Sequence, residues 1–259
     1  LPVIMDFRDD WSGSHLIDYP TRWHKRKMAK LEEQTVLQAD ALTVLDTFMA
    51  DNFKKRYGDE TPLCEVIPHG YDPRDFNGES DSTLKYQPNK LNLLYSGIFI
   101  HNNQPDTLLR AVKNAIEKKA ALQEQLALHF QGGLEKRHHQ IISELDISEF
   151  VFDYDYLPHD QAVANLQKAD ALWFISNFGK DQKQAKSGKL YEYFGSGKPI
   201  LGLIFEDGEE ERLLNEYGAS YLAPPRDIES ITTALLSLYN DWKKKKLAEP
   251  DQDWISQYD

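Results

Sequence analysis

The stretch Leu91-Asn92-Leu93-Leu94-Tyr95-Ser96-Gly97 is a short, almost wholly apolar run that ends in a serine and a glycine. A run of this length without alternating polar positions predicts a strand that is buried on both faces of a sheet. Comparable runs follow it along the chain at 126–130, 150–152, 171–175, 199–204 and 220–222. We therefore expect six buried strands after residue 90.

Apolar residues at three-to-four spacing separate these strands and predict amphipathic helices. The helical patterns lie at 108–116, 162–169, 213–217 and 228–239. Strands that alternate with helices form βαβ units, in which neighbouring strands run parallel. The fold class that we predict is α/β, with a doubly wound, Rossmann-like parallel sheet.

The first 75 residues have a different pattern, with two or three strand candidates at 3–7, 41–45 and 64–68 and two helices at 20–38 and after Asp46. So few elements make a small core, and we expect residues 1–75 to be the closing part of another α/β domain. We assign residues 76–242 to the doubly wound domain and residues 243–259 to a C-terminal tail. The polar residues 77–88 resemble a linker or surface loop.

The composition excludes several classes of protein. The net charge of −12 disfavours nucleic acid as a partner, because binding to it depends on neutralising phosphates. A single cysteine, Cys64, excludes a disulfide framework and indicates a reducing compartment. No apolar run approaches the length that spans a bilayer. Since the chain opens on Leu1 without a signal-peptide pattern, we interpret it as part of a longer protein.

The residues after the strands matter most for function, because ligands of open α/β sheets bind outside the carboxyl ends of the strands. Gly97 follows the first of them and would let a ligand approach the backbone. Ser187, Gly188 and Lys189 open a predicted helix after the strand at 171–175. Free amides at a helix start attract an anion, and Lys189 adds a full positive charge there. A diphosphate fits this arrangement.

Glu192 lies three residues after Lys189 and therefore on the same side of the helix. Its carboxylate could accept hydrogen bonds from the two hydroxyls of a ribose. The alternative is that Lys189 and Glu192 form an ion pair on a solvated face. Composition alone leaves these two interpretations open.

At this point the sequence resembles a known family. The residues Ser-Gly-Lys-Leu-Tyr-Glu-Tyr-Phe-Gly-Ser-Gly-Lys-Pro-Ile at 187–200 resemble the P-x-K-x-x-E-Y-x-A-x-G-K-P-V motif of retaining, family-4 GT-B glycosyltransferases. Residues 6–11 resemble the D-x-R-D-x-W motif of that family, residues 38–45 its A-D-x-V-x-x-x-S motif, and residues 66–72 its V-I-P-N-G-V-D motif. The motifs occur in the family's order over nearly the whole chain.

The resemblance implies a nucleoside diphosphate sugar as donor, with Glu192 on the ribose hydroxyls and Lys189, Ser187 and Gly188 on the diphosphate. Gly97 would let the phosphates approach, and the base would lie against the loop at 154–157. Many members have a second glutamate eight residues before the ribose carboxylate, where this chain has Gln184, a residue able to bind the sugar by hydrogen bonds. The loop at 101–104 also lacks the Lys or Arg of many members.

The function that we expect is transfer of a sugar to a hydroxyl acceptor, with retention and without a metal or other cofactor. The acceptor would be a glycan or a lipid-linked molecule in cell-envelope or capsule polysaccharide synthesis. We expect a cytoplasmic location, with the full-length protein at the inner face of the membrane. Because most of an acceptor domain is missing, the catalytic residues stay unidentified and the chain by itself is expected to be inactive.

Two other interpretations remain. The chain could be a non-catalytic nucleotide- or sugar-binding α/β module, as Gln184 would allow, or a receiver-like or periplasmic-type module, which the absence of an acidic cluster after the first strand disfavours. Asp6, Arg8 and Asp9 could be catalytic or could form an interdomain ion-pair network. The Asp153-Tyr154-Asp155 motif is interpreted as solvated acids and not as a metal site.

Overall fold

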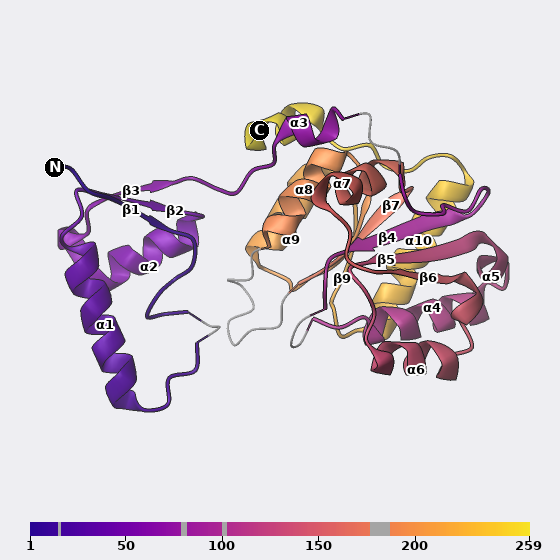
Figure 1. Cartoon of the computed structure of the whole chain (residues 1–259), viewed down its shortest axis with the longest axis horizontal. Helices are drawn as coiled ribbons and strands as arrows, with labels where there is room; N and C mark the ends of the chain where they lie inside the picture. Colours follow the sequence, from indigo (N-terminus) through magenta and orange to yellow (C-terminus); the bar gives the residue numbers. More distant parts are fainter. Residues whose placement is uncertain (15–16, 79–81, 100–102, 177–186) are drawn as a thin grey trace. The chain divides into compact units, whose positions relative to one another are not determined.

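The computed structural model describes residues 1–259 except 15–16, 79–81, 100–102 and 177–186. The chain divides into two compact units, one formed by residues up to His69 and the other by the described residues from Gly70 onward (Figure 1). The boundary predicted from the sequence lies a few residues further along, at position 75.

The first unit is a three-stranded parallel sheet with two helices. The strands are β1 (Ile4–Phe7), β2 (Ala41–Val44) and β3 (Leu63–Val66), in the order β1-β2-β3. The helices are α1 (Arg22–Val36) and α2 (Thr47–Tyr57), followed by a 3-10 turn, η1 (Gly58–Glu60). Asp46 caps α2, because its side chain accepts a hydrogen bond from the amide of Met49 at 2.7 Å. Val36, Leu42, Val44, Met49 and Phe53 form the core.

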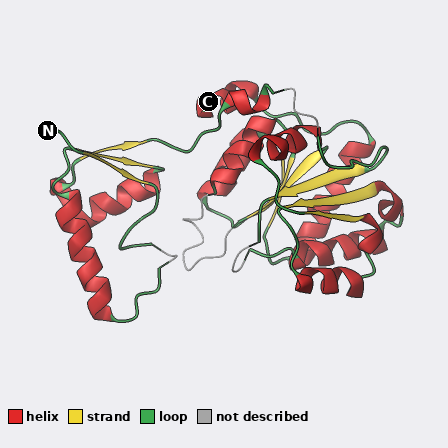
Figure 2. Ribbon diagram, viewed as in Figure 1, coloured by secondary structure: helices red, strands yellow, loops and turns green. Residues whose placement is uncertain are grey.

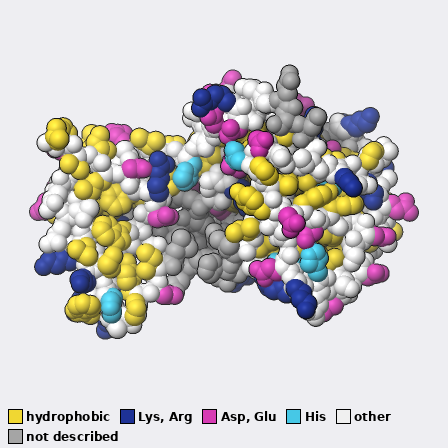
Figure 3. Space-filling view, viewed as in Figure 1, with side chains coloured by type: hydrophobic (Ala, Val, Ile, Leu, Met, Phe, Trp, Pro, Cys, Tyr) yellow, Lys and Arg dark blue, Asp and Glu magenta, His cyan; other side chains and the backbone are white. Residues whose placement is uncertain are grey.

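Within the described residues, helices cover only one face of this sheet. Met5 and Phe7 point toward the core, while Ile4 and Leu63 are 67% and 65% exposed. Figure 3 shows apolar side chains on the surface of this part of the chain, and Val3, Trp23, Val66 and Ile67 are among the exposed ones. An all-parallel sheet is normally buried on both faces, so this open face is an unusual feature.

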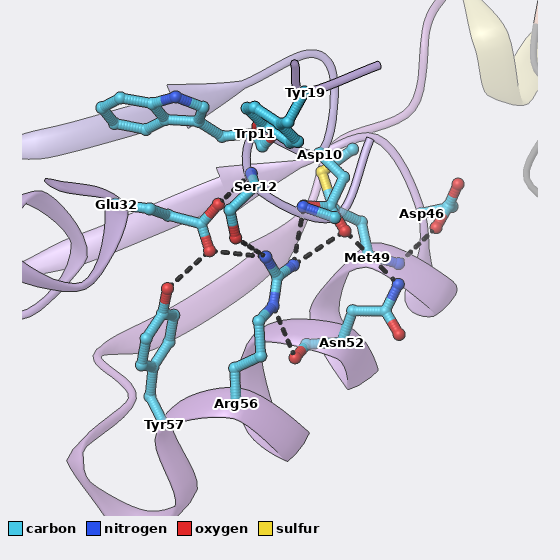
Figure 4. Close-up of polar contacts among 11 residues, drawn as sticks. Asp10, Trp11, Ser12, Tyr19, Glu32, Asp46, Met49, Asn52, Arg56 and Tyr57 are labelled. Carbon is cyan, nitrogen blue, oxygen red and sulfur yellow. Dashed lines mark hydrogen bonds and ion pairs between the residues drawn. The ribbon is translucent and has the colours of Figure 1, made fainter. Parts of the chain in front are cut away.

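A buried ionic cluster around Arg56 fixes the loop that follows β1 to both helices (Figure 4). The Arg56 guanidinium donates to both carboxylate oxygens of Asp10 at 2.7 Å and to Glu32 at 2.5 Å. Glu32 is fully buried and also accepts from the Tyr57 hydroxyl at 2.5 Å and from the amide of Ser12. The cluster therefore joins three separate segments of the unit.

The second unit contains a six-stranded, all-parallel sheet in the order β6-β5-β4-β7-β8-β9. Its strands are β4 (Leu91–Ser96), β5 (Leu126–Gln131), β6 (Val151–Tyr154), β7 (Ala171–Ile175), β8 (Ile200–Leu203) and β9 (Ser220–Ala223). The chain builds outward from β4 through β5 to β6 and then returns to place β7 on the other side of β4. The strand order thus reverses between β4 and β7, as in a doubly wound Rossmann-like sheet. The fold class predicted from the sequence is confirmed.

Helices cover both faces of this sheet (Figure 2). One face packs on α4 (Asp106–Lys118), α6 (Lys136–Glu144) and α10 (Ile228–Lys243), and the other on α7 (His159–Lys168), α8 (Gly188–Ser196) and α9 (Glu209–Tyr217). The shorter helices are α3 (Pro73–Phe76), α5 (Ala121–Gln125) and α11 (Gln252–Ile255), and the 3-10 turns are η2 (Ser148–Phe150) and η4 (Ser256–Tyr258). Within the described residues, every helix is too short or too polar to span a bilayer.

Two segments are more ordered than the sequence suggests. The predicted linker or surface loop at 77–88 contains no helix or strand in its described residues, but it is packed on the domain, because Leu84 is buried and the Tyr86 hydroxyl donates to the backbone of Asn165 at 2.6 Å. In the predicted tail, Trp254 packs on Phe194, with ring centroids 5.1 Å apart. The tail therefore contributes to the packing of α8.

Candidate functional site

The helix α8 begins at the carboxyl edge of the sheet, where the strand order reverses. Ser187 occupies its N-cap position with extended backbone, but its side chain makes no capping hydrogen bond. The carbonyl of Ser187 accepts from the amide of Leu190 at 3.0 Å, and no described residue accepts from the amides of Gly188 and Lys189. Gly188 is exposed. The helix start therefore offers amides and a positive dipole end to an anion, as the sequence predicts.

Lys189 folds back over the end of β4. Its Nζ lies 3.1 Å from the hydroxyl oxygen of Tyr95 and 4.3 Å from the centroid of that ring. Burial lowers the pKa of Lys189 to about 8, and the nearby Glu192 partly offsets this effect. The lysine is thus a partly desolvated cation held against an aromatic face, an arrangement that stabilises an ammonium group by about 0.5–2 kcal/mol.

Gly97 lies directly beneath this ammonium group. A Cβ atom at position 97 would come within 2.5 Å of Lys189 Nζ, and the φ of +123° is one that other residues rarely adopt. The neighbouring loop is equally close, because a Cβ on Gly132 would lie 2.4 Å from the carbonyl oxygen of Gly97. The structure therefore brings Gly97 and Lys189 together. We call the cluster of Tyr95, Gly97 and Lys189 the β4 corner.

Glu192 lies one turn further along α8 and is half-buried. Burial raises the pKa of its carboxyl group, while the positive charges of His159 and Lys189 lower it. His159, at the start of α7, pairs with Asp75 of α3 at 3.0 Å. Among the described contacts, no ion pair joins Lys189 to Glu192, so the interpretation that these two simply pair on a solvated face is not supported.

Tyr193 sets the position of α8 on the sheet. Its fully buried hydroxyl accepts from the amide of Ser96 at 3.0 Å and donates to the carbonyl of Trp173 at 3.2 Å. These two bonds connect the helix to β4 and β7, the strands on either side of the reversal. Because Lys189 and Glu192 lie on the same helix, their placement at this edge depends on Tyr193.

The other sequence-predicted positions have mixed outcomes. Gln184, together with His101 and Asn102, lies outside the described residues. Of the predicted loop at 154–157, Tyr154 ends β6 and residues 155–157 lead toward α7, with Tyr156 81% exposed. Asn103 is buried and donates to the carbonyl of Ile175 at 3.4 Å, while its Oδ1 has no partner among the described atoms.

The acids singled out near the N-terminus are not gathered in one cluster. Arg8 and Asp6 form an exposed pair at 2.7 Å, whereas the buried pair is Arg56 with Asp10. Asp153 accepts from the amide of Leu134 and pairs with His139 at 2.9 Å. No group of three or more His, Cys, Asp or Glu side chains within the described part of the chain is arranged to hold a metal ion.

Sequence reasoning did not identify Tyr95, Tyr193 or Asn103 as part of the site. Tyr95 was counted among the apolar residues of a buried strand, and nothing in its spacing distinguishes it from core residues. The Glu-Tyr pair in the 187–200 motif was the one available signal for Tyr193.

The fold is that of the GT-B glycosyltransferases, with α8 and the β4 corner at the edge where a Rossmann-like sheet binds ligands. Solved structures that match include a sucrose-phosphate synthase from Thermosynechococcus elongatus, with a TM-score of 0.62 and 13% identity, covering 94% of this chain and 60% of that one. The pneumococcal O-GlcNAc transferase GtfA, solved with UDP and GlcNAc, has a TM-score of 0.62 and 14% identity, covering 95% and 46%. HepE from Anabaena, solved with UDP and glucose, has a TM-score of 0.59 and 14% identity, covering 95% and 64%.

This chain therefore spans about half to two thirds of the length of these proteins. Neither a protein-family profile nor a curated protein sequence matches it. At such low identity the similarity establishes the fold.

Proposed function

We propose that this chain binds a nucleoside diphosphate sugar and is the donor-binding portion of a glycosyltransferase. The observation that carries the proposal is the meeting of Lys189 Nζ, the open amides at the start of α8 and Gly97 where the strand order reverses. The overall fold agrees with this reading, as do the UDP complexes of GtfA and HepE.

In this proposal the diphosphate occupies the β4 corner. The Lys189 ammonium group and the amides of Gly188 and Lys189 donate to the diphosphate oxygens. Because Gly97 has no side chain, these oxygens have room to approach the end of β4. Glu192 accepts from the ribose hydroxyls, one turn further along the helix. Gln184 would contact the sugar.

The chemistry that this arrangement suits is departure of a diphosphate from the anomeric carbon of the sugar. The leaving oxygen gains negative charge as the glycosidic bond breaks. Lys189 and the helix dipole are already directed at that charge, so they stabilise the transition state without having to reorganise. We propose a hydroxyl acceptor on a glycan or lipid-linked molecule, retention at the anomeric carbon and a role in cell-envelope or capsule polysaccharide synthesis.

Isothermal titration of the chain with UDP, GDP, ADP and uridine tests the donor site. We expect one diphosphate to bind clearly best. Glu192→Ala should weaken nucleoside and nucleotide alike by about tenfold, since it removes hydrogen bonds to a charged acceptor. Lys189→Ala should weaken the diphosphate by a similar factor and leave the nucleoside unchanged.

Glu117→Ala, a change at an exposed position of α4, is the matched control and should leave every affinity unchanged. Equal affinities in the wild type and both site variants would remove the proposed site. A radiolabelled-donor assay addresses transfer itself: we expect donor binding without turnover, and normal turnover would show that this chain contains a complete active site.

A further inference from the structure

The hydroxyl group of Tyr95 both donates and accepts a hydrogen bond. It donates to the carbonyl of Ile98 at 3.4 Å and accepts from Lys189 Nζ at 3.1 Å. A hydroxyl group has one hydrogen to donate, so Ile98 uses that hydrogen and a lone pair of the oxygen faces the ammonium group.

The ring of Tyr95 is held as firmly as its hydroxyl. Tyr95 is 1% exposed, and its ring stacks on Phe99 at 4.3 Å with an interplanar angle of 9° and packs against Trp173 at 4.9 Å. A side chain enclosed on all sides has a single rotamer, because close-packed interiors leave no room for another. The hydroxyl oxygen is therefore a fixed point at the end of β4.

Lys189, by contrast, carries four rotatable bonds, and a free lysine would spread its ammonium group over a wide volume. Here the same ammonium group rests on the ring face and on the hydroxyl oxygen of one rigid residue. One of its three hydrogens points to Tyr95, and no other described residue accepts a hydrogen bond from it.

We propose that Tyr95 is a positioning residue for donor binding: it holds the Lys189 ammonium group over Gly97 and ties it to the backbone of Ile98. This inference rests on the proposed function, because it assumes that a diphosphate binds at the β4 corner. Among the described residues, Lys189 is the cation of the β4 corner. Because Tyr95 already holds its ammonium group in place, a diphosphate could bind there without first having to order a flexible lysine side chain.

The charged and titratable groups around Lys189 come from several elements. Glu192 lies on the same helix, Tyr95 on β4, and the His159–Asp75 pair of α7 and α3 acts on Glu192. Loss of the Tyr95 hydroxyl removes an acceptor of the ammonium group and therefore favours the neutral amine. The loss of diphosphate affinity in a variant without this hydroxyl should accordingly grow as the pH rises through the pKa of Lys189.

The test compares Tyr95→Phe with the wild type by titration with UDP, inorganic pyrophosphate and uridine at pH 7.0 and pH 8.5. We expect UDP and pyrophosphate to bind about tenfold more weakly to the variant at pH 8.5, with a smaller loss at pH 7.0. Uridine affinity should not change.

Tyr239→Phe is the matched control. Tyr239 is also buried, carries Lys119 Nζ over its ring at 4.8 Å and donates its hydroxyl hydrogen to Gln125, but it lies on α10. This variant should bind every ligand as the wild type does.

The possible results distinguish a failure of the proposed donor binding from a failure of the positioning role of Tyr95. If the wild type binds none of UDP, GDP, ADP and pyrophosphate, the proposed function fails and this inference fails with it. If the wild type binds UDP or pyrophosphate, unchanged or tighter binding of these ligands by Tyr95→Phe overturns the inference alone. A loss of uridine affinity as large as the loss for UDP would overturn it too, because Tyr95 would then act through the general fold.

Discussion

At the level of single residues, Lys189 combines a positive charge with a partly desolvated position on an aromatic ring. Burial lowers its pKa to about 8, so the ammonium form predominates below that pH and the neutral amine above it. An anion binds only the ammonium form strongly. Binding and protonation of this lysine are therefore linked.

The linkage predicts that UDP affinity is highest below about pH 8 and falls by up to tenfold per pH unit as the pH rises from 8 to 9. In that range, binding of UDP should be accompanied by uptake of a proton by Lys189. Calorimetry in two buffers of different ionisation enthalpy measures that uptake directly. Lys189→Ala should bind weakly with a flat profile over the same range. A flat profile in the wild type would contradict the linkage.

The role of these residues in binding stays a prediction, but part of the candidate site could be located at this scale. Gly97, Lys189 and Glu192 could be located because their residue types occur at positions where sheet edges and helix starts bind ligands. Tyr95 could not, since an apolar strand predicts its burial but not which side chain from α8 will rest on it. That contact depends on the rotation of the helix, which Tyr193 sets through two bonds to distant strands.

At the level of elements, one arginine of the first unit neutralises two buried carboxylates. Arg56 of α2 neutralises Asp10 and Glu32, which belong to a loop and to α1 and are 9% and 0% exposed. Removing the arginine leaves two acids buried without a counter-charge.

Arg56→Met should therefore reduce the free energy of unfolding of this unit by about 3–5 kcal/mol. Arg8→Met breaks an ion pair of which both members are about half exposed, and should cost less than about 1 kcal/mol. Urea unfolding, together with hydrogen exchange of the α1 and α2 amides, measures both effects. Similar small losses in the two variants would mean that the cluster contributes little.

All nine strands of the described residues could be predicted, because short apolar runs bounded by polar residues are distinctive in an α/β chain. The short helices α3, α5 and α11 could not, since helices of four or five residues carry no measurable periodicity. The segment around Leu84 and the helix around Trp254 were also missed. Their order comes from packing on α7, α8 and α9, which local sequence does not encode.

At the level of the whole molecule, the described residues of the proposed donor site all belong to the second unit. The two larger cores belong to it as well. We predict that residues 70–259, produced alone, fold and bind UDP within about threefold of the affinity of the full chain. Circular dichroism and titration calorimetry measure this. Loss of binding in a folded 70–259 protein would show that the first unit contributes to the site.

The open face of the β1-β2-β3 sheet has a consequence for how copies of this protein behave toward one another. Apolar side chains and unpaired strand edges attract each other across molecules, whereas a net charge of −12 keeps those molecules apart. Dissolved salt shortens the reach of that repulsion to about 10 Å at 0.1 M and leaves the apolar attraction intact. Ionic strength, more than protein concentration alone, should thus govern the colloidal behaviour of the chain.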